Sequence, residues 1–293
     1  GALMLLTSAI ITGLGLGAMY GLIALGFHIT YTVSNTVNFA QGSAMMVGAV
    51  LGFTLMVTYG LPFWIAAPIA IAGCAVFGLV VERLLVRPFV ERNSDAWLMA
   101  TVAGGIIVDN AVMFLFGKEP RSLPSPLATN SIEFLGTGVY PLQLIIPVVG
   151  IAVAVALQIV FRKTDLGKAL LAVVQNRDAA RLMGINATVV VASAFAISTA
   201  LAGLAGLLIA PLFSVHSDMG TLFGLKAFAV AILGGITSAT GVMIAGLLYG
   251  LIEALVTAYL GSTYTQIVVF SVIILALALR PNGLLGRASI NKV

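Results

Sequence analysis

Three ionisable side chains lie inside long apolar stretches of the sequence: Asp109, Lys226 and Glu253. Each stands several residues in from the end of its stretch, which places all three roughly 9–12 Å below one membrane surface if the stretches are helices. A charge at the centre of a bilayer costs about 2.5–3.5 kcal/mol, so we expect Lys226 to pair with Glu253 or Asp109, or to reach the outer surface. The layer is interpreted either as a structural ion pair or as the outer gate of a transport path.

Residue types that perform catalysis are almost absent. Cys74 is the one cysteine, and the two histidines, His28 and His216, lie far apart, so neither a metal site nor an enzyme is expected. The segment 162–169 contains Gly-Lys but lacks both the first glycine and the final Ser or Thr of a phosphate-binding loop. No cofactor is expected in this chain.

The composition indicates an integral membrane protein. Hydrophobic residues make up 60% of the 293 residues and charged residues only 8%, whereas soluble domains carry about 25% charge. The net charge of +4 does not indicate nucleic-acid binding, because the basic residues lie in the gaps between apolar stretches. We expect residues 1–293 to form a single transmembrane domain.

The apolar stretches predict an all-α, polytopic transmembrane helix bundle with eight or nine spans. The segment 221–235 is short for a full span and is expected to be a half-helix or a re-entrant segment. The stretches cover residues 3–29, 39–59, 62–81, 96–117, 141–161, 188–212, 221–235, 240–260 and 264–279.

Basic residues predict the orientation, because cytoplasmic loops are rich in Lys and Arg. The segments 82–95 and 162–187 and the C-terminal tail with Arg287 and Lys292 are expected in the cytoplasm. The proline-rich segment 118–140 is expected outside. Nine spans then place the N-terminus outside and the C-terminus in the cytoplasm; eight spans would move the N-terminus inside.

Glycines recur every four residues in several stretches, at Gly13, Gly17 and Gly21 and in the pairs Gly48/Gly52, Gly220/Gly224 and Gly246/Gly250. Small residues on one face let helix backbones approach closely in lipid. The pattern indicates close helix packing. Alternatively, it indicates thin helices that line a path through the membrane and slide against one another.

The stretch from His28 to Asn38 is too polar for lipid contact. Asn38 and Gln41 have the spacing of a capping box, which predicts a helix start at Phe39. The stretch is either a helix–helix connection or a broken helix beside a path. Candidate path residues are Tyr20, Asn35, Asn38 and Gln41.

The segment 162–187 predicts a short helix over residues 177–183. Asn176 is a good N-cap, Asp178 and Arg181 match the helix dipole, and Gly184 suits the position after the helix. So short a helix needs a surface to dock on. Leu182 and Met183 are the expected anchors, either on a partner or on lipid headgroups.

At this segment the sequence resembles the permeases of ABC importers, and more narrowly the branched-chain amino acid family among them. The resemblance covers nearly the whole chain, with Gln41 standing where that family commonly has His. It rests on LGAMYGLIALGF (16–27), VNFAQGSAMMVGA (37–49), GKALLAVVQNRDAARLMGIN (167–186), LKAFAVAILGGITSATGVMIAGLLYGLIEAL (225–255) and LRPNGLLG (279–286).

The resemblance implies a permease in the bacterial inner membrane. Its expected partners are a related second permease, two cytoplasmic ATPases that bind the ATP, and a periplasmic binding protein; a homodimer is less expected. The resemblance also implies a cytoplasmic coupling loop, 162–187, and a substrate that is a branched-chain or other hydrophobic amino acid, although urea, short amides and aromatic acids are also carried in this group. A secondary transporter using Asp109 and Glu253 as ion sites, or a channel, are the alternatives. The coupling residues would be Asn176, Arg177, Asp178, Arg181, Leu182, Met183 and Gly184.

Overall fold

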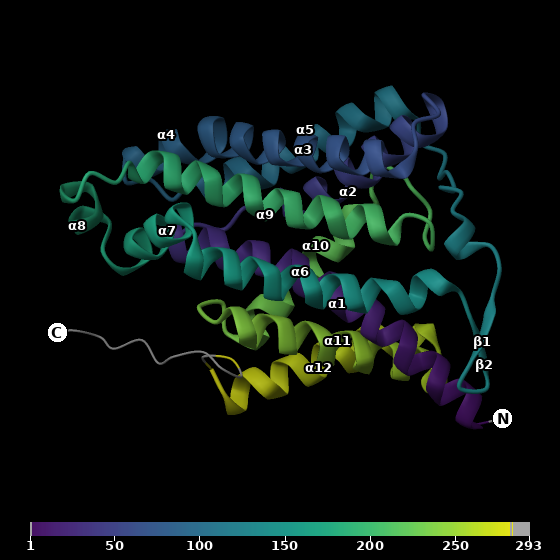
Figure 1. Ribbon diagram of the computed structural model, residues 1–293. Helices are drawn as coiled ribbons and strands as arrows, with labels where there is room; N and C mark the ends of the chain where they lie inside the picture. Colours follow the sequence, from purple (N-terminus) through teal and green to yellow (C-terminus); the bar gives the residue numbers. More distant parts are fainter. Residues whose placement is uncertain (1, 282, 284–293) are drawn as a thin grey trace.

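The structure is a computed structural model that describes residues 2–281 and 283. It is a layered bundle of long helices with short elements at both ends (Figure 1). The long helices are α1 (Ala2–Ser34), α2 (Gln41–Phe53), α3 (Phe63–Val81), α5 (Trp97–Phe116), α6 (Pro141–Lys163), α9 (Ala187–Ile209), α10 (Met219–Gly234), α11 (Ala239–Leu260) and α12 (Ser262–Leu279).

The predicted all-α membrane bundle is confirmed. Each predicted apolar stretch overlaps one of these helices, and in the described residues eight helical segments are long and apolar enough to cross a membrane. The ninth, α10, has 16 residues and is the short element expected near 221–235. The π-helical turns Thr54–Thr58 (η1) and Glu82–Val86 (η2) continue α2 and α3 without a break.

The nine helices alternate in direction. Gly13 of α1 lies against Gly250 of α11 and Gly17 lies against Gly246, so α11 runs antiparallel to α1. The short α10 runs alongside α1, with Phe223 beside Tyr20 and Phe228 beside Phe27. Helix α10 therefore runs parallel to α1 and antiparallel to α11. This direction agrees with nine membrane-crossing segments rather than with a re-entrant loop.

The central helix is α1, which is buried along most of its length and contacts α6, α9, α10 and α11. Its glycines permit this position. A Cβ atom at Gly17 would lie 2.7 Å from the Gly246 carbonyl oxygen, and one at Gly220 of α10 would overlap the Gly42 carbonyl of α2. The glycine spacing read from the sequence therefore marks helix contacts, as close packing in lipid requires.

Short elements gather at the two ends of the bundle. At one end lie α4 (Arg87–Glu91), α7 (Asp165–Gln175) and α8 (Arg177–Leu182), and α12 also ends there (Figure 1). At the other lie the start of α1 and the hairpin of β1 (Ile132–Phe134) and β2 (Thr137–Val139), preceded by a 3-10 turn, Pro126–Ala128. The basic segments 82–95 and 162–187 thus share one end. Arg287 and Lys292 lie outside the described residues.

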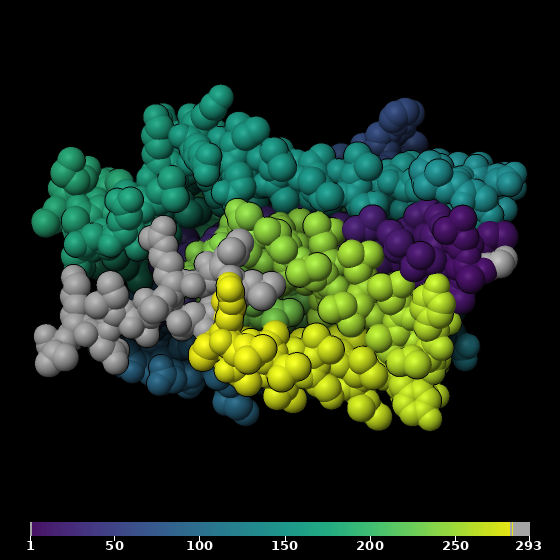
Figure 2. Space-filling view, turned by 90° about the horizontal axis from the view of Figure 1, so that it is seen from below, coloured from purple at the N-terminus to yellow at the C-terminus, as the bar shows by residue number. Residues whose placement is uncertain are grey.

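The bundle presents apolar side chains on its sides. Figure 2 shows α12 and α11 lying side by side along one face. On α12, Ile267, Ile274 and Leu275 are exposed. Such a surface requires lipid or another membrane subunit against it.

The polar stretch from His28 to Asn38 differs from its prediction. The α1 helix continues through it to Ser34, because the hydroxyls of Thr30, Thr32 and Ser34 donate to carbonyls of the preceding turn. The connection is only residues 35–40, and α2 begins at Gln41, not Phe39. The capping box does not form, since the Gln41 amide donates instead to the carbonyls of Ile23 and Ser198.

Candidate functional site

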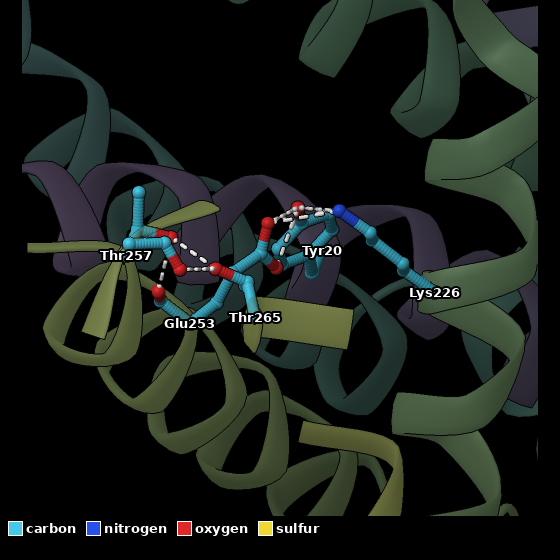
Figure 3. Close-up of polar contacts among 6 residues, drawn as sticks. Tyr20, Lys226, Glu253, Thr257 and Thr265 are labelled. Carbon is cyan, nitrogen blue, oxygen red and sulfur yellow. Dashed lines mark hydrogen bonds and ion pairs between the residues drawn. The ribbon is translucent and has the colours of Figure 1, made fainter. Parts of the chain in front are cut away.

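Lys226 and Glu253 form a buried ion pair. The Lys226 Nζ lies 2.8 Å from Glu253 Oε1, and the two side chains are 7% and 12% exposed. The Tyr20 hydroxyl donates to both carboxylate oxygens, at 3.0 and 3.2 Å (Figure 3). Of the two partners that the sequence left open for Lys226, the structure selects Glu253. We call Tyr20, Lys226 and Glu253 the charge cluster.

Three helices hold the charge cluster. Tyr20 comes from α1, Lys226 from α10 and Glu253 from α11, so the cluster as a whole joins the short helix α10 to α1 and α11. The Tyr20 ring packs edge-on against Tyr249, at 5.3 Å between ring centres, and against Phe223 at 5.5 Å. These aromatic walls exclude water, which strengthens the attraction between the charges.

Polar groups continue from the charge cluster towards the end of α11. The Thr257 hydroxyl donates to the Glu253 carbonyl and also contacts the Thr265 hydroxyl of α12, at 2.9 Å (Figure 3). The buried Tyr249 hydroxyl has no hydrogen-bond partner among the described residues. A buried donor without a partner costs about 1–3 kcal/mol.

Asp109 does not join the charge cluster, although the sequence placed it in the same layer. Its Oδ1 accepts a hydrogen bond of 2.8 Å from the Ser43 hydroxyl of α2. Ser43 also donates to the Gly105 carbonyl on the helix that carries Asp109. Equal depth along separate helices did not bring the three charges together, because their helix faces point in different directions.

The remaining path candidates occupy different surroundings. Gln41 is buried and ties α2 to α1 and α9, with Ser198 as a reciprocal partner. Asn38 is buried; its Oδ1 accepts from the Ala40 N–H, while its Nδ2 has no partner among the described residues. Asn35 is exposed and adopts a left-handed backbone with φ of 58°, where it ends α1.

The short helix predicted in segment 162–187 is present as α8. The Asn176 side chain accepts from the Ala179 N–H, with Asp178 in the first turn and Arg181 in the last. Gly184 follows in a left-handed conformation, with φ of 87°. The helix ends at Leu182 rather than at residue 183.

The end of α8 is its most exposed part. Leu182 is 88% exposed and Met183 is 82% exposed. On another side of α8, Arg177 and Arg181 line a small cavity with Ser34, the last residue of α1, and with Glu82. Burial and the charge of Arg181 lower the pKa of the Arg177 guanidinium, against the opposing charges of Asp178 and Glu82. The helix therefore contacts the ends of membrane helices and presents two apolar side chains outward.

Several contributors were missed from the sequence. Helix α7 was not predicted, although Thr164 and Asp165 form a helix start and Gly167, Leu170 and Val173 recur on its buried side. Ser43, the partner of Asp109, gave no signal, because a lone serine in an apolar stretch is common. The Arg121 guanidinium carbon lies 4.1 Å from the centre of the Phe116 ring. This contact was also missed, because it depends on the path of the loop that follows α5.

Comparisons with known proteins agree with this architecture. A family model described as "branched-chain amino acid transport system / permease component" matches residues 9–277. The chain is 33% identical over 297 residues to the high-affinity branched-chain amino acid transport system permease protein BraD of Pseudomonas aeruginosa, covering 97% of each. It is 32% identical to permease protein LivH of Escherichia coli strain K12, covering 96% of each.

Two more distant similarities extend the comparison. The permease protein LivM of Salmonella typhimurium is 27% identical over 293 residues, which cover 91% of this chain and 68% of LivM. Among solved structures, PsaBC from Streptococcus pneumoniae in complex with Fab matches with a TM-score of 0.50 and 16% identity, covering 92% of this chain and 91% of that one. This last similarity concerns the fold alone.

Proposed function

Since the chain belongs to the family of branched-chain amino acid transport permease components, we propose that it forms part of the membrane path of an ATP-driven importer for branched-chain or other hydrophobic amino acids. The observation that carries this proposal is helix α8, a capped helix outside the membrane bundle with apolar residues at its tip. A permease without a nucleotide site of its own requires such a contact with an ATPase.

Helix α8 has the properties of a docking element. Six residues cannot form a stable helix alone, and its caps and dipole charges support the form that a partner would bind. Leu182 and Met183 are suited to a cleft on a cytoplasmic ATPase. The cavity that Arg177 shares with Ser34 and Glu82 supports transmission of the ATPase movement to α1 and α3.

The complex that we propose contains four kinds of protein. The chain resembles both LivH and LivM, which supports a related second permease as its partner. Two ATPases would bind at the end that carries α8, and a substrate-binding protein at the end that carries β1 and β2. The location is the inner membrane, with the basic segments and the C-terminus in the cytoplasm.

The charge cluster is proposed as the outer gate. Lys226 is the link from α10 to both α1 and α11, and α10 is the shortest of the nine helical segments once η1 is counted with α2. Separation of Lys226 from Glu253 would free α10 to move, while Tyr20 keeps one hydrogen bond on the carboxylate. A closed gate of this kind is neutral overall, which suits a bilayer.

Co-purification tests the coupling proposal. The affinity-tagged chain, expressed with its second permease and the ATPase, should retain the ATPase in detergent. Replacement of both Leu182 and Met183 by Asp should release it. Leu135→Asp is the matched control, because Leu135 is equally apolar and 72% exposed but lies at the opposite end. Retention of the ATPase by the double variant would overturn α8 as the docking element.

A further inference from the structure

A cavity of about 260 Å³ lies beside Asp109, away from the charge cluster. It is lined by residues of α1, α2, α5 and α10 and of the connection before α2, and it opens on the side of the bundle beside the exposed Ile106 and Leu225. Its walls are the rings of Phe27, Phe39 and Phe228, aliphatic and glycine residues, and the hydroxyl side chains of Ser43 and Thr221. None of the described residues that line it is basic, and Asp109 is its one charged group.

The cavity lies at mid-depth in the bundle. Ser43 is the third residue of α2, and the first residue, Gln41, bonds to Ser198 at the midpoint of α9. In secondary transporters, substrate sites lie near the bilayer midplane, where helices are interrupted inside the membrane. The start of α2 within the bundle is such a point.

The Asp109 carboxylate has room for another hydrogen bond. Oδ1 accepts from Ser43, and no described residue donates to Oδ2. Asp218, the residue before α10, adds negative charge, since it interacts electrostatically with Asp109. A half-buried carboxylate in this position favours a cationic ligand with hydrogen-bond donors, and a primary ammonium supplies both.

The aromatic side of the cavity favours hydrocarbon. The Phe228 ring packs against Phe27 and Phe39 at 5.6 and 5.3 Å between ring centres. The rings can receive a branched alkyl group and also stabilise a nearby cation. The floor is closed, because Gly42 of α2 lies in direct contact with Gly220 and Gly224 of α10.

We propose that this cavity binds the transported amino acid, with its ammonium group on Asp109 and its apolar side chain against Phe27, Phe39 and Phe228. The proposal rests on the function proposed above and deepens it by naming a substrate site. Asp109 and Ser43 determine the position of the amino group, and the three rings determine the size of the side chain.

Amine binding to the purified permease–ATPase complex tests the site without transport. The probe is 3-methylbutylamine, which is leucine without its carboxylate, and the comparison compound is 4-methylpentanoate, which is leucine without its amino group. Thermal unfolding is recorded against the concentration of each. The amine should protect the wild type, and Asp109→Asn should raise the half-saturating amine concentration about tenfold or more, because a charge-assisted hydrogen bond is lost. The carboxylate compound should not protect either.

Two variants sharpen the test. Glu133→Gln removes an exposed carboxylate on β1 and should bind the amine as the wild type does. Phe228→Ala enlarges the cavity and should shift preference towards 2-phenylethylamine. Asparagine can still accept from Ser43, so Asp109→Asn should assemble normally. Equal protection of the wild type and Asp109→Asn, or protection of neither, would overturn the site.

Uptake separates this inference from the proposed function. In proteoliposomes that contain the complete importer, Asp109→Asn should slow leucine uptake by about tenfold or more for the same reason. Unchanged uptake would contradict the site and leave the importer function standing. Asp109-dependent amine binding in a complex that imports no amino acid would contradict the function and leave the site standing.

Discussion

At the scale of single residues, the charge cluster holds an ion pair whose disruption is costly. Both charges are withdrawn from water, and each is compensated by the other and by Tyr20. Removing one partner of a buried pair costs about 3–5 kcal/mol, since the remaining charge has no compensation. Opening of the gate therefore requires a comparable free energy, which must come from the substrate, from water or from another part of the complex.

Exchange of the two charges distinguishes a gate from a structural tie. Lys226→Met should reduce the amount of assembled permease, because it leaves Glu253 buried without its partner. The double variant Lys226→Glu with Glu253→Lys should restore assembly, measured by size-exclusion chromatography, while uptake stays low because the exchanged groups no longer meet Tyr20 correctly. Full recovery of both assembly and uptake would show that the pair is only a tie.

Part of this residue-level picture could be predicted from the sequence. The cost of an unpaired charge in lipid was enough to predict a partner for Lys226, and depth limited the choice to two carboxylates. Depth is one coordinate, however, and the direction in which each side chain leaves its helix is another. Asp109 therefore bonds to Ser43 instead, a contact that only the packing of α2 against α5 determines.

At the scale of elements, α8 is specified almost entirely by local sequence. Its cap, its charges and its terminal glycine act within one or two turns, so that its start and end followed from residue types. The extension of α1 and the start of α2 did not. There, hydroxyls bonding back within α1 and the contacts of Gln41 with α1 and α9 replace the expected capping box.

Two substitutions at one position test α8 as the coupling element. Gly184 has φ of 87°, and its N–H donates to Arg181. Gly184→Pro cannot adopt this conformation and loses the donor, so stimulation of ATPase activity by the loaded binding protein should fall to the basal rate. Gly184→Asn is the control, because Asn tolerates a left-handed backbone and a Cβ atom there meets no neighbour. Stimulation that survives in both Gly184→Pro and Arg181→Glu would rule out coupling through α8.

At the scale of the whole molecule, the alternation of nine helices follows from the apolar stretches and their short connections. The predicted span count and the common end of the basic segments could be read from the sequence, since lipid imposes helices and basic loops avoid translocation. The order in which helices pack could not. The packing order depends on which glycine-bearing helix faces contact each other, such as α1 with α11 and α2 with α10. A single sequence shows the glycines on each helix but not which helix each face contacts.

Cysteine labelling from intact cells tests the orientation. In a Cys74→Ser background, Gln175→Cys places a thiol beside α8, and Glu133→Cys places one on the β hairpin; both positions are exposed. Asn176 is avoided because its side chain caps α8. An impermeant reagent added outside should label position 133 and leave 175 unlabelled until the cells are broken. The reverse pattern would invert the proposed membrane orientation.

The most direct test of the account is uptake of labelled leucine into proteoliposomes that contain this chain, the second permease and the ATPase. We predict that leucine accumulates only when ATP is present on the side of the membrane that carries α8 and the loaded binding protein is present on the opposite side. Collapse of the ion gradients should not change this uptake. Leucine uptake that proceeds without nucleotide and disappears when the ion gradient is collapsed would contradict the importer function and indicate a secondary transporter.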